Sequence, residues 1–338
     1  GETYIDQFPN MYIMPKIMYD YGTVKPGFYF SSDEIINRLS LFGGASINKD
    51  SDVDLFFMFD FKRFYPTLFF ETFYLTRNIN DKSTYQGAYA INDNIKFRLV
   101  QFRSGIKYPI FGSSLEFSLA RQWYRAFIKE QIYTNEHGIL NAGAAYDYYR
   151  GWILNGSWSM DMRKRTLHKS INPTGGFSLH SSIDFEINDF IEGLDLSNSG
   201  TLLEKFQSNN LSRVQLGGTY HLEIPWIKDM AVSLGSKIGW INYNNVDSFF
   251  HFYLGGMSGI RGYPYYSIQG TKSFLIDFTL RMPIFMEEHY KFNWMIFQNS
   301  TIALITQVGD AWKDEFSMKK SFGIQWRING FSFYNFPT

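Results

Sequence analysis

The stretch that decides the fold is Arg213-Val214-Gln215-Leu216-Gly217-Gly218-Thr219-Tyr220-His221-Leu222-Glu223-Ile224. Every even position except Gly218 carries an apolar side chain, whereas the odd positions carry polar side chains or Gly217. Successive side chains of a β-strand point to opposite faces, so this period of two predicts a strand with one apolar and one polar face.

The same alternation recurs along the chain, in residues 52–62, 177–188, 273–282 and 321–328. Each alternating segment covers about 10 residues, the length that a tilted strand needs to cross a bilayer. A soluble β-sandwich is the alternative, but it would have to bury either the apolar or the charged face. A barrel with lipid outside and water inside satisfies both faces. We therefore predict an all-β fold, a transmembrane antiparallel β-barrel.

The composition of the 338 residues agrees with a barrel: 19% are aromatic, and aromatic girdles mark both interfaces of such proteins. No run of about 18 apolar residues is present, which argues against membrane-spanning helices. The absence of cysteine excludes disulfides and thiolate metal sites. The net charge of zero gives no argument for nucleic acid as a partner. Neither a metal nor a cofactor is expected.

The predicted organisation is a single barrel domain over residues 1–338, with eleven strands before a long loop at 242–270 and four after it. The polar segment 190–210 is predicted to be a long surface loop. Bacterial single-chain barrels usually have an even number of strands, and the chain ends on Pro337-Thr338. We therefore expect a last strand outside this sequence. The predicted strands lie near 10–20, 35–48, 51–62, 66–77, 94–104, 114–128, 138–149, 154–164, 175–188, 211–224, 229–241, 271–284, 300–309, 319–328 and 331–338.

The long loop contains Leu254-Gly255-Gly256-Met257-Ser258-Gly259-Ile260-Arg261-Gly262-Tyr263-Pro264. Its glycines allow tight or left-handed backbone. Folded back into the lumen, the loop would let Arg261 donate hydrogen bonds to carboxylates or carbonyls of the inner wall. The alternative is an ordinary exposed loop with a solvated arginine, and the residues alone leave both open.

Ile260-Arg261-Gly262-Tyr263 resembles the Val/Ile-Arg-Gly-Phe/Tyr loop signature of the BamA/TamA superfamily of outer-membrane assembly and translocation proteins. In that family the loop lies between strands eleven and twelve of a sixteen-stranded barrel. Residues 271–284 resemble strand twelve, and 321–328 resemble strand fourteen. Strand thirteen, with its Asp-x-Gly-x-x-Trp pattern, is similar to the segment that holds Gln307, Gly309, Asp310 and Trp312.

The resemblance also implies a partner for Arg261. The family's acidic residues on strands twelve and thirteen correspond here to Thr279 and Gln307, which alternation still places inside the barrel. Asp277 lies on the same face. We therefore expect Arg261 to bond Gln307, Thr279 or Asp277, with a weaker hold than a carboxylate would give if the partner is a neutral group.

The implied function is insertion or translocation of client outer-membrane or secreted proteins by a laterally gated barrel in the outer membrane of a Gram-negative cell. Outer-membrane lipid and accessory lipoproteins are the further expected partners, and a periplasmic N-terminal domain is expected outside this sequence. The chain end also resembles surface-antigen-like barrels that follow a β-propeller in Bacteroidota-like chains. Pro15 lies in the first strand, where a missing ladder donor suits a weak seam.

Three other functions compete with a general assembly factor. A passive pore or structural barrel would share the fold, and so would a dedicated secretor of one substrate. An enzyme is the third, because His180, Ser182 and Asp184 share one strand face. Same-face neighbours along a strand are about 6.6 Å apart, too far for a hydrogen-bonded relay. We expect the protein not to be an enzyme.

Overall fold

The computed structural model describes residues 10–20, 23–85, 89–134, 138–164, 173–196, 202–227, 229–257, 259–286, 288–293 and 295–332. Fourteen of its strands have nine residues or more; eleven precede the loop 242–271 and three follow it. These long strands are β1 (Tyr12–Asp20), β2 (Thr23–Asp33), β3 (Leu39–Ile47), β4 (Val53–Phe61), β5 (Thr67–Tyr85), β6 (Tyr89–Ile110), β7 (Ser113–Thr134), β8 (Gly138–Asp161), β9 (Gly176–Leu196), β10 (Leu202–Glu223), β11 (Ala231–Ile241), β14 (Lys272–Phe285), β16 (Met295–Trp312) and β17 (Lys319–Ser332).

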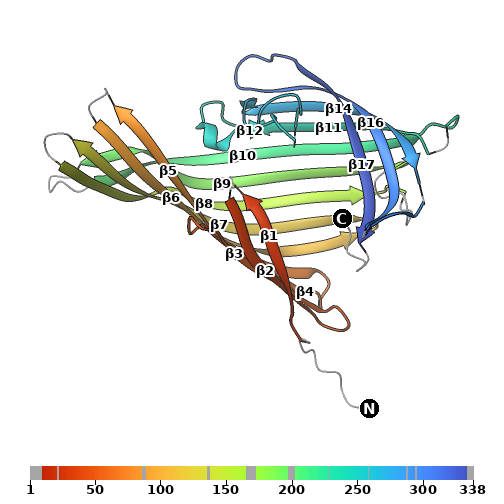
Figure 1. Ribbon diagram of the computed structural model, residues 1–338, viewed down its shortest axis with the longest axis horizontal. Coiled ribbons are helices and arrows are strands. Elements are labelled where there is room, and N and C mark those ends of the chain that lie inside the picture. Colours follow the sequence, from red (N-terminus) through yellow and green to blue (C-terminus); the bar gives the residue numbers. More distant parts are fainter. Residues whose placement is uncertain are drawn as a thin grey trace, which may run out of the picture. The chain divides into compact units, whose positions relative to one another are not determined.

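The order of the strands in the sheet follows their order in the sequence (Figure 1). It runs from β1 through β11 to β14 and β16, and both β17 and the short β15 (Tyr290–Phe292) pair with β16. The neighbouring strands are antiparallel. This simple up-and-down connectivity is the one that membrane barrels use. Among the described residues, no helix is long and apolar enough to span a membrane.

The chain divides into two compact units. Unit 1 comprises Gly1–Tyr108, Glu116–Gly156 and Phe185–Asn210, and unit 2 comprises Pro109–Leu115, Ser157–Asp184 and Leu211–Thr338. Strands β6 to β10 contribute residues to both units. The loop and its surroundings belong to unit 2.

The predicted alternation is present, and its polarity is the reverse of a water-soluble sheet. In β14, Thr279 and Arg281 are only 2% and 8% exposed, whereas Phe278 and Met282 are 43% and 47% exposed. A soluble protein would bury the phenylalanine and expose the arginine. An apolar outer face and a polar inner face are what a strand between lipid and a polar interior requires. The fold prediction is therefore confirmed.

Two errors in the predicted strands cancel. No strand was expected at β2, whereas β8 is one continuous strand that runs through two predicted ones. Pro26 and Gly27 gave β2 the composition of a turn. In β8, Arg150-Gly151 also has the composition of a turn. Gly151 nevertheless continues the strand, and its lack of a Cβ leaves room for the ring of Tyr149, with which a Cβ would collide. The predicted count of eleven strands before the loop survives because one strand was missed and one was split.

The predicted surface loop at 190–210 is wrong. Strands β9 and β10 extend through most of it, and only 197–201 lie outside the described residues. Polar pairs hold these strands together in place of apolar side chains: Lys205 lies 2.9 Å from Glu192, and Ser208 donates to Asp189 at 2.6 Å. Cross-strand polar pairs stabilise a sheet without giving an apolar period. The predicted strand 331–338 is not separate, since β17 reaches Ser332 and 333–338 lie outside the described residues.

Strand length divides the sheet into two classes. Strands β1 to β4 have 9 to 11 residues, whereas β5 to β10 have 19 to 24. About 9–11 residues cross a bilayer, so the long strands continue well beyond the span. Strands β5 and β6 pair from Thr67↔Lys107 to Tyr85↔Tyr89. The polar residues 78–85 and 89–92, which lay outside the predicted strands, therefore belong to the extensions of these two strands.

The inverted polarity predicts opposite results for an arginine on each face of one strand. Leu216 of β10 is 50% exposed on the apolar face, and its neighbour Gln215 points to the other face. Leu216→Arg should lower the free energy of unfolding by about 2–4 kcal/mol, the cost of a charge near the bilayer centre. Gln215→Arg should cost much less. Urea titration of the protein folded into lipid vesicles measures both, and equal losses would contradict the assignment of faces.

Candidate functional site

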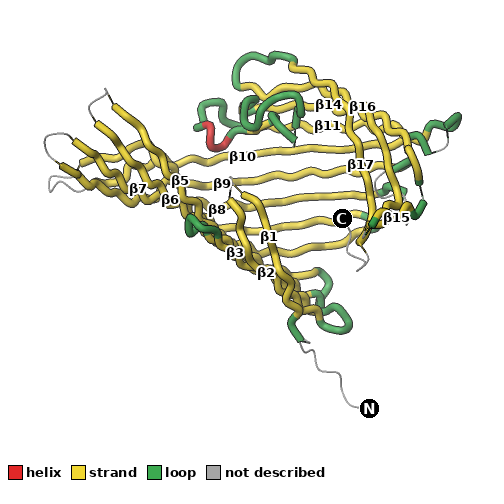
Figure 2. Tube along the Cα trace, viewed as in Figure 1, coloured by secondary structure: helices red, strands yellow, loops and turns green. Residues whose placement is uncertain are grey.

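The candidate site is the loop 242–271 between β11 and β14, which lies against these two strands (Figure 2). It contains the 3-10 helix η1 (Ser248–Phe250) and a short antiparallel pair of two-residue strands, β12 (Phe252–Tyr253) and β13 (Gln269–Gly270). Arg213 of β10 donates to the carbonyl oxygen of Phe250 at 2.7 Å and stacks on the ring of Phe252. The start of the loop is thus held on the polar face of the sheet.

The loop has a small apolar core of its own. Leu254, Ile260 and Ile268 pack with Leu275 of β14 and Ala311 of β16. Ile260 is fully buried. Burying one such side chain contributes about 1.5–3 kcal/mol, so the isoleucine of the predicted signature is an anchor that fixes the loop on the sheet.

The glycines of the loop are required by its tight path. Gly256 has a φ of 89°, a left-handed conformation that glycine adopts without strain. Its N–H donates to the carbonyl oxygen of Tyr263 at 3.0 Å, which closes the turn. A Cβ on Gly255 or Gly259 would collide with the backbone of the same loop.

Gln307 of β16 connects the loop to the sheet. Its Oε1 accepts from the backbone N–H of Arg261 at 2.9 Å, and its Nε2 donates to the carbonyl oxygen of Gly259 at 2.9 Å. The same Nε2 donates to Asp277 at 2.8 Å, and Thr279 donates to the second oxygen of that carboxylate at 2.7 Å. The three inner-wall residues named from the sequence therefore form one network beneath the loop.

The register of the strands explains why this network can form. Gly235 of β11, Asp277, Gln307 and Ser321 of β17 lie opposite one another across four strands. Ser321 Oγ accepts from the N–H of Gly262 at 3.0 Å. A Cβ on Gly262 would come within 2.8 Å of that oxygen, so any larger residue there would have to displace the Ser321 hydroxyl. We call the sheet surface that carries this row the loop face.

The contacts of the Arg261 guanidinium differ from the expectation. The bond to Gln307 comes from the backbone of Arg261, and the side chain is exposed. Within the described residues the guanidinium has no hydrogen bond or ion pair. Alternation along the strands placed Asp277, Thr279 and Gln307 on the correct face, but it could not say which atom of the loop would reach them.

The strand-thirteen motif supports the turn that follows β16. Asp310 is 1% exposed and accepts from Lys319 Nζ at 2.5 Å and from the backbone N–H of Ser317 at 2.6 Å. Gly309 allows close approach of the β14 backbone. The ring of Trp312 packs edge-on against the ring of Phe316 in this turn, with 5.0 Å between the ring centroids. These residues hold β16 and β17 in the register that brings Gln307 and Ser321 under the loop.

Pro15 lies in β1, opposite Phe28 of β2. Because proline has no N–H, it cannot donate to a ladder on either side. β1 is the first strand in the order of the sheet. Its role at a seam stays a prediction.

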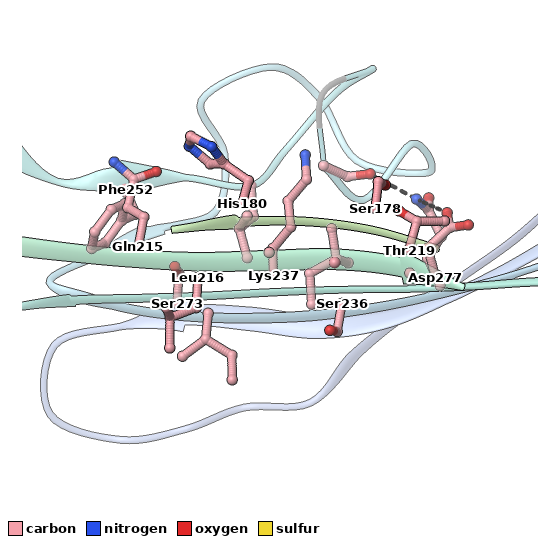
Figure 3. A pocket seen from close by; sticks show the side chains of 18 of the residues that line it. Ser178, His180, Gln215, Leu216, Thr219, Ser236, Lys237, Phe252, Ser273 and Asp277 are labelled. Atoms are coloured by element: carbon pink, nitrogen blue, oxygen red, sulfur yellow. Dashed lines mark hydrogen bonds between the residues drawn. The ribbon is translucent and has the colours of Figure 1, made fainter. Parts of the chain in front are cut away.

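A cavity of about 770 Å³ lies beside the loop on unit 2. Figure 3 shows His180 and Lys237 directed to one side of the sheet and Ser236 to the other. Arg261 and Arg281 also line the cavity. Sequence reasoning did not single out Lys237 and Arg281, although the period of two already placed them on the polar face. Among the described residues no group of three acidic or histidine side chains could hold a metal ion.

His251 is the titratable loop residue whose pKa is shifted. Burial lowers the pKa of His251, and the positive charge of Lys313 acts in the same direction, whereas Asp247 and the carbonyl of Val246 oppose the shift. Both ring nitrogens are buried without a hydrogen-bond partner among the described residues. The docked loop therefore favours the neutral imidazole.

The lowered pKa predicts that acid loosens the loop. An undocked His251 binds a proton below about pH 6.5, whereas the docked one resists protonation, so docking is most stable above that pH and weakens as pH falls. A spin label on Met257→Cys, unique because the chain has no cysteine, should become more mobile between about pH 7.5 and 5. His251→Gln should remove most of this dependence, and an unchanged pH profile would contradict it.

Removal of the Gln307 amide should also free the loop. Gln307→Ala deletes both hydrogen bonds to the loop and should weaken its docking by about 1–3 kcal/mol. The same label on Met257→Cys would report this as faster motion. Gln101→Ala is the matched control, because Gln101 is an amide of unit 1 that accepts from Gln122 at 3.0 Å. Equal mobility in both variants would show that Gln307 does not hold the loop.

Comparison with known proteins supports the fold. No protein-family model matches the sequence, and no curated protein sequence matches it significantly. Among solved structures, CdiB from Escherichia coli is similar with a TM-score of 0.53 and 10% identity, over 98% of this chain and 58% of that one. CdiB from Acinetobacter baumannii has a TM-score of 0.49 and 12% identity, over 96% and 56%. The chain thus spans under two thirds of either CdiB chain, and the likeness to CdiB from Escherichia coli supports a β-barrel fold.

Proposed function

We propose that this chain is the barrel of an outer-membrane protein that inserts or translocates client polypeptides, with the loop 242–271 as its internal gate. The observation that carries the proposal is the docking of Ile260-Arg261-Gly262 on the loop face through Gln307 and Ser321. The fold shared with CdiB supports an outer-membrane barrel of the translocation or channel type.

The strength of the docking suits a gate rather than a permanent plug. Gln307 is a neutral amide, and each of its bonds contributes about 0.5–1.5 kcal/mol net. An arginine–carboxylate pair in the same place would hold more firmly. The apolar core of the loop is compact and contacts the sheet through Leu275 and Ala311. Release of the loop would therefore break the hydrogen bonds to Gln307 and Ser321 and separate the apolar core of the loop from Leu275 and Ala311.

Release of the loop would expose the polar loop face to a passing polypeptide. No covalent step is needed, so we propose a protein that is not an enzyme. The resemblance of Ile260-Arg261-Gly262-Tyr263 to the superfamily signature extends the proposal to a lateral opening at β1, where Pro15 weakens the ladder. Client outer-membrane or secreted proteins, outer-membrane lipid and accessory lipoproteins are the partners that this mechanism calls for.

A depletion experiment in the source organism tests the proposal. We expect the surface amounts of client proteins to fall as this protein disappears, measured by quantitative proteomics of the outer membrane and the medium. Loss of many unrelated barrels would identify an assembly factor, and loss of one or a few exported proteins would identify a dedicated secretor. Intact surface proteins with slower uptake of small solutes would overturn the proposal in favour of a passive pore.

Complementation then assigns the loop its role. Gln307→Ala should restore the amount of barrel but restore clients only in part, because the gate no longer docks correctly. Gln101→Ala should restore both. If the two variants complement equally, the loop is not the gate.

A further inference from the structure

We propose that Arg261, Arg281 and Arg327 on the loop face of unit 2 form a binding site for the carboxylates of an acidic polypeptide segment. The site deepens the proposed function, on which it rests, because it names the chemistry of the segment that the gate receives. Each arginine comes from a different element: the loop, β14 and β17.

The three guanidinium groups lie within electrostatic range of one another. Arg281 is repelled by Arg327 and Arg261, and Arg327 is repelled by Arg261. The register explains the approach, because Arg281 lies opposite Ala303 of β16 and Arg327 lies opposite Thr301 of the same strand. These two positions are neighbours on one face of β16. The tertiary structure thus gathers three like charges that are separate in the sequence.

The negative charge near this cluster is already engaged. Asp277 is the one carboxylate among the described residues that line the cavity, and it attracts Arg281 and Arg327. Both of its oxygens accept hydrogen bonds, from Gln307 and Thr279. One carboxylate cannot balance three guanidinium groups, so the site keeps an excess of positive charge.

Arg281 supplies a second, independent observation that points to a carboxylate ligand. Its side chain is 8% exposed, and Nη1 donates to Ser233 at 2.8 Å. Its Nε is buried with no hydrogen-bond partner among the described residues. A buried donor without a partner is costly, and a carboxylate would satisfy it. Planar guanidinium groups bind carboxylates through paired hydrogen bonds, which lysine cannot do.

The cavity beside the cluster is large enough for several peptide residues. Its volume of about 770 Å³ falls in the range of ordinary ligand sites. Gly235 helps to keep it open, because a Cβ there would meet only ordinary contacts at 3.5 Å and beyond. A monatomic or sulfate-sized anion would leave most of this space unused.

Binding of a hexaglutamate peptide with a neutral fluorophore to the full chain in detergent tests the proposal. We expect saturable binding by fluorescence anisotropy that weakens with added salt, and no binding of the matching hexalysine peptide. Arg261→Gln and Arg327→Gln should each weaken binding about tenfold, the scale of one lost charged hydrogen bond. Arg327→Lys should lose less, because it keeps the charge. Lys205→Gln removes a positive charge paired with Glu192 in unit 1 and should change nothing.

A variant that keeps every charge separates the site from a general attraction. Gly235→Phe fills the cavity without altering the arginines and should abolish hexaglutamate binding. Each variant is first checked for folding by its heat-dependent mobility in gels. Unchanged binding in the two arginine-to-glutamine variants or in Gly235→Phe would overturn the site. Displacement of the peptide by sulfate at equal charge concentration would also overturn it, because the cluster would then be a site for small anions.

The result is separable from that of the proposed function. If Gln307→Ala lowers the surface amounts of client proteins in the cell while hexaglutamate fails to bind, the gate proposal is supported and only the proposed site for an acidic segment is wrong. If hexaglutamate binds at the arginines but depletion leaves every client in place, the site stands as an anion-binding surface of a pore, and the translocation proposal falls.

Discussion

A chain that faces hydrocarbon must satisfy every backbone N–H and C=O group within itself, because lipid offers no partner. Antiparallel strands that pair with their neighbours along the sequence meet this constraint in this protein. The pairing in turn directs alternate side chains to opposite faces. Phe278 and Met282 are exposed while Thr279 and Arg281 are buried, which reverses the usual arrangement of a soluble protein. Every other feature of the molecule, including the loop, is built on that polar inner face.

The polar face has to balance its own charges. In unit 1, Lys25 is fully buried and donates to Asp54 at 2.9 Å, and Arg77 donates to the other oxygen of the same carboxylate at 2.5 Å. A buried charge without such a partner would be strongly destabilising. Unit 2 differs, because Asp277 accepts hydrogen bonds from the neutral side chains of Gln307 and Thr279, although three arginines lie within electrostatic range. The contrast between a closed charge network and an open one distinguishes a structural part of the wall from the proposed binding site.

The loop combines firm packing with weak polar attachment. Ile260 is completely buried and fixes where the loop sits, whereas a single neutral amide, that of Gln307, makes two of the bonds that hold it to the sheet. A carboxylate at that position could not donate to the carbonyl of Gly259. Gln307 both donates and accepts, so it binds backbone on both sides of Ile260 and leaves the guanidinium of Arg261 available.

The amino-acid sequence alone determined the period of two, the polarity of the faces and the presence of the glycine-rich loop, because these depend on near neighbours in the chain. It did not reveal β2, the continuity of β8 across Gly151 or the strands through 190–210, where partners on other strands replace the local apolar pattern. Only the tertiary structure decided that Gln307 binds the backbone of Arg261. It also decided that Arg261, Arg281 and Arg327 come near one another on the loop face. The register between strands sets such meetings, and register is a relation among segments far apart in sequence.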